Sequence, residues 1–87
     1  MRLTDNQLKI LKVLSDKNPD GTDVDLDQLL DRLAEEFDWV TTKAALQWSL
    51  RQLISMELVE RMEKEIRRKR ARRILKLSPL GIKVMGP

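Results

Sequence analysis

The N-terminal part of the chain shows polar capping residues followed by apolar positions at helical spacing. Thr4 and Gln7 stand three residues apart, as in a capping box. The apolar face that follows consists of Ile10, Leu11, Val13 and Leu14. Asparagine, proline, aspartate and glycine then follow one another at 18–21, a combination typical of a turn. This pattern predicts a helix over about 5–16.

The second apolar segment has the clearest helical period in the chain. Asp25 and Gln28 repeat the capping-box spacing. Apolar residues then recur three and four positions apart at Leu26, Leu29, Leu30, Leu33, Ala34 and Phe37. Because this period places them on one face, we expect an amphipathic helix over about 26–37.

A third helix is expected over about 42–56, after a short connection at 38–40. Thr41 is the expected cap, and Leu46, Leu50 and Leu53 fall on one face. Two helices joined by so short a connection, the second with a polar outer face, form a helix-turn-helix pattern.

Beyond residue 58 the apolar and polar positions alternate with a period of two, which predicts strands. The alternation is interrupted by a basic run at 67–73 and resumes toward Leu77. We expect an antiparallel hairpin over about 58–78 with its turn at 67–71. No Gly, Pro, Asn or Asp marks this turn, so a continuation of the third helix through Met62 and Ile66 is the alternative.

A chain of 87 residues fits one domain, and we expect a single domain over 1–87, mostly α with a small β-hairpin (α+β). There is no apolar run long enough for a membrane span and no signal-peptide pattern, so we expect an intracellular protein, cytoplasmic or nucleoid-associated. The expected core consists of Leu8, Leu11, Leu14, Leu29, Leu30, Leu33, Phe37, Leu46, Leu50, Leu53, Leu75 and Leu77.

Cysteine and histidine are both absent. Their absence removes thiol nucleophiles, the usual general base and the usual zinc ligands. Four aspartates at 20–27 do not fit a calcium loop, because Gln28 and Ala34 occupy the positions that need glycine and glutamate. We therefore expect no catalytic residue, cofactor, metal or small-molecule ligand, and a protein that is not an enzyme.

Charge is divided unevenly along the chain. Residues 1–40 carry 5 basic and 10 acidic side chains, whereas residues 41–87 carry 12 and 4, which gives −5 and +8. Such a division orients a molecule toward a polyanion with its basic half leading.

Two segments resemble the winged helix-turn-helix DNA-binding domain of small transcriptional regulators. LRQLISMELVER at 50–61 resembles the passage from the recognition helix into the first strand of the hairpin, which that family calls a wing. LKLSPLG at 75–81 resembles its closing strand with a Leu-Ser/Thr-x-x-Gly ending. At Glu57 the family usually has a glycine in a left-handed conformation. The resemblance implies double-stranded DNA as partner and transcription regulation as the process.

The candidate nucleic-acid-binding residues lie on the third helix and in the basic run. Those for the major groove are Thr41, Thr42, Lys43, Gln47 and Arg51, and those for phosphates are Arg67, Arg68, Lys69, Arg70, Arg72 and Arg73. Trp48 is expected to be exposed, as an anchor for a protein or intramolecular contact or for stacking on DNA. A protein-interaction module and an RNA-binding module are the alternatives, and a homodimer on DNA is a further expectation.

Overall fold

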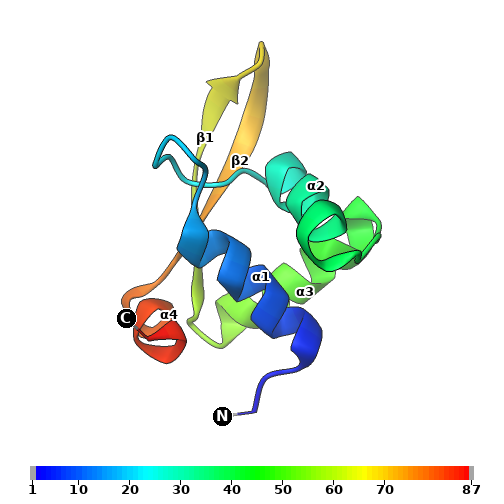
Figure 1. Ribbon diagram of the computed structural model, residues 1–87. Coiled ribbons are helices and arrows are strands. Elements are labelled where there is room, and N and C mark those ends of the chain that lie inside the picture. The colour runs from blue at the N-terminus through cyan, green and yellow to red at the C-terminus, as the bar shows by residue number, and fades with distance from the viewer. Residues whose placement is uncertain (1, 87) are drawn as a thin grey trace.

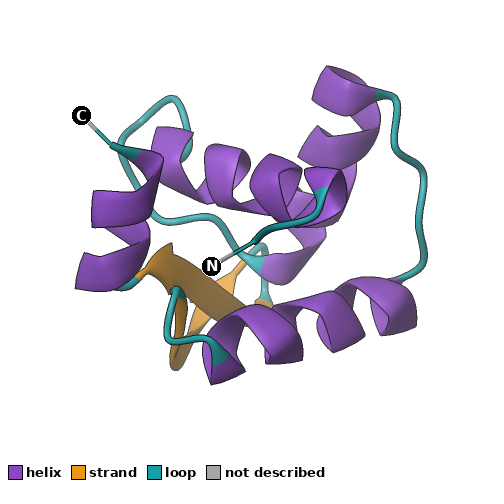
Figure 2. Ribbon diagram, turned by 90° about the horizontal axis from the view of Figure 1, so that it is seen from below, coloured by secondary structure: helices purple, strands orange, loops and turns teal. Residues whose placement is uncertain are grey.

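Six helices and strands follow one another in the computed structural model, which describes residues 2–86 (Figure 1). They are α1 (Asp5–Asp16), α2 (Leu26–Phe37), α3 (Lys43–Ser55), β1 (Val59–Arg67), β2 (Arg70–Leu77) and α4 (Pro79–Met85). Seen from below, the helices surround a common centre and the hairpin is viewed nearly end-on (Figure 2). The expected fold class, α+β with a two-stranded hairpin, is confirmed.

Capping boxes begin α1 and α2 at the residues that the sequence indicates. The Thr4 hydroxyl accepts from the Gln7 backbone N–H at 3.1 Å, and the Gln7 side chain accepts from the Thr4 N–H at 2.9 Å. Asp25 and Gln28 make the same reciprocal pair at 2.9 and 3.1 Å. Each box satisfies two backbone donors that a helix start leaves free.

The cap of α3 lies one residue later than expected. Thr42, rather than Thr41, accepts the Ala45 backbone N–H at 3.1 Å. Both residues are threonines, and helix termini are located from sequence only to within a residue or two.

The end of α3 is a Schellman motif with glutamate at the position usually held by glycine. The Leu58 N–H donates to the Leu53 carbonyl at 3.0 Å, and the Glu57 N–H donates to the Ile54 carbonyl at 2.9 Å. Glu57 has φ 63°, so the left-handed conformation that the resemblance implies is present. This motif turns the chain from α3 directly into β1.

The hairpin, residues 59–77, replaces the alternative of a longer third helix. Its strands are antiparallel, and the register shifts by a bulge between Arg61 and Lys64. The turn is narrower than the expected 67–71 and consists of Arg68 and Lys69, with φ 51° and 65°. Two-residue hairpin turns of this kind favour Asn-Gly, because both central residues need positive φ. The sequence carried no turn signal because arginine and lysine occupy these strained positions.

A short extended segment before α2 joins the free edge of β2. The Leu75 N–H donates to the Val24 carbonyl at 3.0 Å, and Asp25 forms an isolated bridge with Ile74. Figure 1 shows this segment crossing beside the strands before it enters α2. The hairpin is therefore connected through backbone hydrogen bonds to the helical body.

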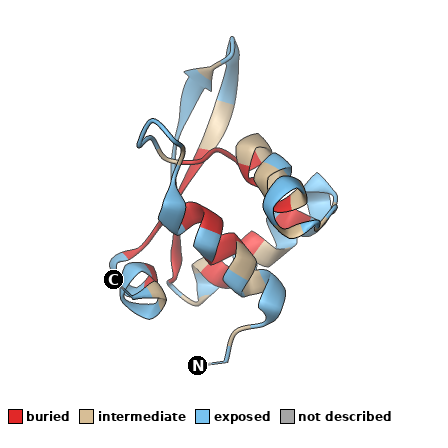
Figure 3. Cartoon of the chain, viewed as in Figure 1, coloured by how far each residue is buried: buried red, intermediate tan, exposed pale blue. Residues whose placement is uncertain are grey.

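The core lies between the three long helices and the base of the hairpin, whereas the outer hairpin is exposed (Figure 3). Most of the expected core residues are buried, and Leu30 and Phe37 pack against the core while partly exposed. Leu8 is an incorrect prediction, because it is 41% exposed, whereas the apolar face of α1 that is buried consists of Ile10, Leu11, Val13 and Leu14. Leu8 and Ile10 are two residues apart, so a helix places them on opposite sides, and Leu8 falls on the outer side.

The fourth helix was not expected, because the segment at 75–81 was interpreted as a strand ending. Ser78 caps α4, accepting from the Gly81 N–H at 3.0 Å, and its hydroxyl donates to the Glu57 carbonyl. A Cβ added to Gly81 would lie 2.1 Å from the Leu58 carbonyl oxygen. Glycine is therefore required for α4 to pack against the junction between α3 and β1.

Candidate functional site

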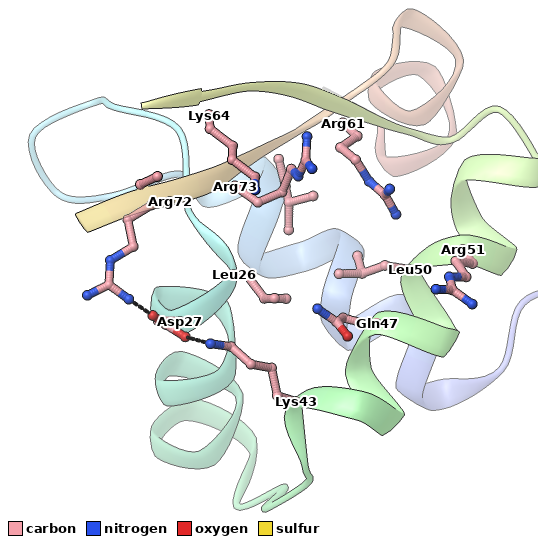
Figure 4. A pocket seen from close by; sticks show the side chains of 12 residues that line it. Leu26, Asp27, Lys43, Gln47, Leu50, Arg51, Arg61, Lys64, Arg72 and Arg73 are labelled. Atoms are coloured by element: carbon pink, nitrogen blue, oxygen red, sulfur yellow. Dashed lines mark hydrogen bonds and ion pairs between the residues drawn. The ribbon is translucent and has the colours of Figure 1, made fainter. Parts of the chain in front are cut away.

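A cleft lies between α3 and the hairpin and is lined mainly by cations (Figure 4). The basic side chains on it are Lys43, Arg51, Arg61, Lys64, Arg72 and Arg73. Leu26, Leu50 and Leu75 supply apolar surface, and Asp27 is the acidic residue of the lining. An anionic partner is the complement of such a surface.

Asp27 bridges two of these cations from the first turn of α2. One of its carboxylate oxygens lies 2.8 Å from Lys43 Nζ, and the other pairs with Arg72 (Figure 4). Within residues 2–86, Arg72 Nε is the one buried side-chain polar atom without a hydrogen-bond partner. Asp27 therefore links α3 to β2 across α2, while it leaves the guanidinium incompletely satisfied.

Two further cations of the cleft face one another on the hairpin. Lys64 and Arg73 are direct cross-strand partners, so their side chains share one face of the sheet. Among the described residues no carboxylate lies within 4 Å of either. Like charges directly opposite one another destabilise a sheet, so this pair costs free energy in the absence of a counter-charge.

The basic hairpin is attached to α2 through Asp25, whose side chain is fully buried. Arg68 Nη2 lies 2.9 Å from Asp25 Oδ2, and Arg67 Nη1 lies 3.7 Å from the same oxygen. Arg67 also donates to the Asp23 carbonyl at 2.7 Å. The Asp25 carboxylate, which caps α2, thus also forms ion pairs with Arg67 and Arg68 at the end of the hairpin.

The six cations expected at 67–73 therefore divide into two groups. Arg67, Arg68 and Arg72 are held in ion pairs with Asp25 or Asp27. No such pair is made within residues 2–86 by Lys69, Arg70 or Arg73. Of these three, Arg73 is the one that lines the cleft. The structure does not gather the six into one site.

The candidates on α3 are also divided. Lys43, Gln47 and Arg51 line the cleft, whereas Thr42 accepts a capping hydrogen bond and Thr41 is half-buried.

Trp48 is exposed as expected, with 61% of its surface accessible. It lies beside a separate shallow hollow, lined also by Arg51, Gln52, Ser55 and Met56.

Arg61 and Lys64 were missed as site residues. Regular alternation places residues three apart on opposite faces of a strand, but the bulge between them brings both to the side of Leu75 and Arg73. The alternation of apolar and polar residues continues through this part of the sequence, so it gives no indication of the bulge.

The aspartates at 20–27 have separate partners and do not form one cluster. Hydrogen bonds from the Thr22 hydroxyl at 2.6 Å and from its backbone N–H at 3.0 Å lower the pKa of Asp20. Asp23 lies 3.8 Å from Lys17. In the described part of the chain, no group of three or more histidine, cysteine or acidic side chains is placed to hold a metal ion.

Comparison with known proteins gives a likeness to a solved structure. No protein-family model matches the chain, and no curated protein matches it. Among solved structures, it is similar to the ferric uptake regulator of Francisella tularensis, solved with iron, with a TM-score of 0.60 and 19% identity. The match covers 91% of this chain and 55% of that regulator, so the chain spans about half of the regulator's length.

This likeness establishes the fold. Four helices and a two-stranded antiparallel hairpin are arranged as in part of that regulator. Within residues 2–86, no helix is both long and apolar enough to cross a membrane.

The role of Asp25 can be tested with Asp25→Asn, which keeps a good helix cap but removes the charge. We expect the free energy of unfolding to fall by about 1–3 kcal/mol, less than for a fully buried pair because the Arg68 side chain is 48% exposed. Urea denaturation measures it. Asp23→Asn, which loses one partly exposed pair, is the matched control and should cost no more than about 0.5 kcal/mol. Equal losses in both variants would show that Asp25 does not anchor the hairpin.

Proposed function

We propose that this protein binds double-stranded DNA as a small transcriptional regulator and is not an enzyme. In this proposal the fold is a winged helix, α3 enters the major groove and the hairpin is its wing. The cleft is the observation that carries the proposal, because it sets polar residues of α3 beside unpaired cations of the hairpin.

The chemistry of the two walls suits the two parts of a duplex. Gln47 and Arg51 are exposed on α3, and glutamine and arginine side chains can make bidentate contacts to adenine and guanine edges. Arg61, Lys64 and Arg73 stand on the opposite wall, where phosphates flanking the groove would lie. Thr41, Thr42 and Lys43 stand at the start of α3, which enters the groove first in this arrangement.

The remaining cations have different roles in this proposal. Lys69 and Arg70 contact phosphates farther along the backbone, since neither has an internal ion pair within the described residues. Arg67, Arg68 and Arg72 position the hairpin, and each reaches a phosphate only by leaving its aspartate.

The likeness to a protein named as a regulator supports this class of function. A sequence-specific site normally requires two copies of so small a reader, and a homodimer on DNA therefore forms part of the proposal.

A protein-interaction module is the second candidate, and Trp48 is the observation that favours it. A 61% exposed indole beside a shallow hollow is a typical anchor at protein interfaces. On α3 the same side chain would also contact the floor of the major groove in the DNA complex.

The phosphate contacts can be tested with Lys64→Gln/Arg73→Gln. We expect weaker duplex binding, with a slope of log K against log salt that is shallower by about 2, because two phosphate contacts are lost. The same variant should unfold at a slightly higher temperature, since two facing like charges are removed. Fluorescence anisotropy across a salt series and thermal denaturation measure the two effects.

Lys12→Gln/Lys83→Gln is the matched control for this variant, because it removes two exposed charges from α1 and α4. An equal change of slope in the control would show that the cleft is not the binding surface. If the unmodified protein binds no DNA duplex at low salt, the DNA proposal fails, and tight binding to an RNA duplex of equal length would then favour the RNA-binding alternative.

Asp27 occupies two cations that a phosphate could use, so Asp27→Asn should strengthen duplex binding. We expect an affinity about tenfold higher at low salt and a steeper salt slope, because Lys43 and Arg72 become available. Glu35→Gln removes one exposed negative charge farther along α2 and is the control for net charge. A gain no larger than that of the control would place the phosphates away from Lys43 and Arg72.

Trp48 distinguishes the two candidate functions through its own fluorescence. With Trp39→Phe, Trp48 is the remaining indole, and we expect saturating duplex to protect it from acrylamide quenching because the groove would cover it. If the complex forms while Trp48 stays as accessible as in the free protein, the indole is left for a protein partner. Circular dichroism checks that the Trp39→Phe variant is folded.

A further inference from the structure

An apolar side chain stands near the tip of the most cationic part of the molecule. Ile66 is 76% exposed and lies one residue before the end of β1. It contributes nothing to the core, and its cross-strand partner is Ala71, whose side chain is too small to cover it. Arg67, Arg68, Lys69 and Arg70 follow it directly in the chain.

The strand register places Ile66 on the side of the hairpin that faces the cleft. Ile66 and Lys64 are two residues apart on β1, so they share a face with their partners Ala71 and Arg73. Lys64, Ala71 and Arg73 all line the cleft. Ile66 therefore continues the cleft-facing surface outward, toward the tip that projects beyond the helices (Figure 1).

The end of the hairpin that carries Ile66 is held in place by interactions of its arginines. Next to it, the Arg67 guanidinium donates to the Asp23 carbonyl and lies within ion-pair distance of Asp25. Arg68 is paired with Asp25 as well, and the turn beyond it has only two residues. Separating two stacked base pairs costs free energy, and a side chain on a flexible loop would move aside instead of separating them. A side chain that acts as a wedge therefore needs a rigid support such as this one.

We propose that Ile66 inserts between base pairs in the minor groove beside α3, so that the protein bends the DNA it binds. An apolar side chain presented among arginines and lysines is the combination by which minor-groove proteins unstack a base step and kink the duplex, by about 20–90°. The kink forms most easily at pyrimidine–purine steps, which are the most deformable. This inference rests on the proposed DNA binding and adds an activity to it.

Ring closure of DNA tests the proposal without knowledge of the target site. Ligase closes duplexes shorter than the persistence length of about 150 base pairs only rarely, and a protein that kinks them raises the yield of circles. We expect the unmodified protein to raise this yield by about tenfold or more on a fragment rich in TA steps.

Three variants separate a wedge from an ordinary strand residue. Ile66→Thr keeps the β-branched shape that suits a strand but removes the apolar end, so it should bind duplex within about threefold of the unmodified protein and give no extra circles. Ile66→Leu keeps an apolar wedge and should retain ring closure. Ile82→Thr, which alters an exposed isoleucine of α4, is the control and should behave as the unmodified protein does.

The outcomes separate this inference from the function on which it rests. Binding without added ring closure by the unmodified protein, or equal ring closure with Ile66→Thr, overturns the wedge and leaves DNA binding intact. Absence of duplex binding by the unmodified protein, measured by anisotropy in the same buffer, overturns both.

Discussion

The buried carboxylate of Asp25 connects the two halves of the molecule. One of its oxygens caps the first turn of α2, and the other receives Arg68 from the far end of the hairpin. Its backbone pairs with Ile74 of β2, so the same residue joins a helix start, a sheet edge and a turn. A buried carboxylate without partners would be costly, and these partners together make the arrangement specific to one position of the hairpin. The hairpin is thus held to the start of α2 by backbone pairing and by this carboxylate together.

The cations of the basic half, residues 41–87, serve two different roles: some hold the hairpin to the helices, and others are left without an acidic partner among the described residues. Cations close to α2 are neutralised by Asp25 and Asp27, and they fix the hairpin to the helices. Cations on the cleft-facing surface, such as Lys64 and Arg73, are left beside one another without an acidic partner among the described residues. Repulsion of this kind is tolerated in a folded protein where binding of an anion relieves it. The net charge of the half therefore overstates the number of cations free to meet a partner.

Local signals in the sequence were sufficient for α1, α2 and α3 and for the presence of the hairpin. Caps such as Thr4 act over three residues, and apolar stripes act over a few turns, so both can be read from neighbouring letters. The Ser-Pro pair at 78–79 is a helix-start signal of the same kind, although the resemblance of 75–81 to a closing strand predicts a strand ending there. The bulge that unites Arg61 and Lys64 depends on strand pairing instead. The ion pairs of Arg68 with Asp25 and of Arg72 with Asp27 join residues 43 and 45 positions apart, a separation over which no pattern in the chain indicates contact.

The packing of Gly81 against the Leu58 carbonyl joins α4 to the segment between α3 and β1. That carbonyl also accepts the Ser78 N–H at 3.0 Å, and the neighbouring Glu57 carbonyl accepts the Ser78 hydroxyl, so α4 holds the joint where α3 turns into β1. The elements on either side of this joint, α3 and β1, contribute to the two walls of the cleft. Neither Ser78 nor Gly81 lines the cleft, yet a larger side chain at Gly81 would have to displace the Leu58 carbonyl and with it the joint between α3 and β1.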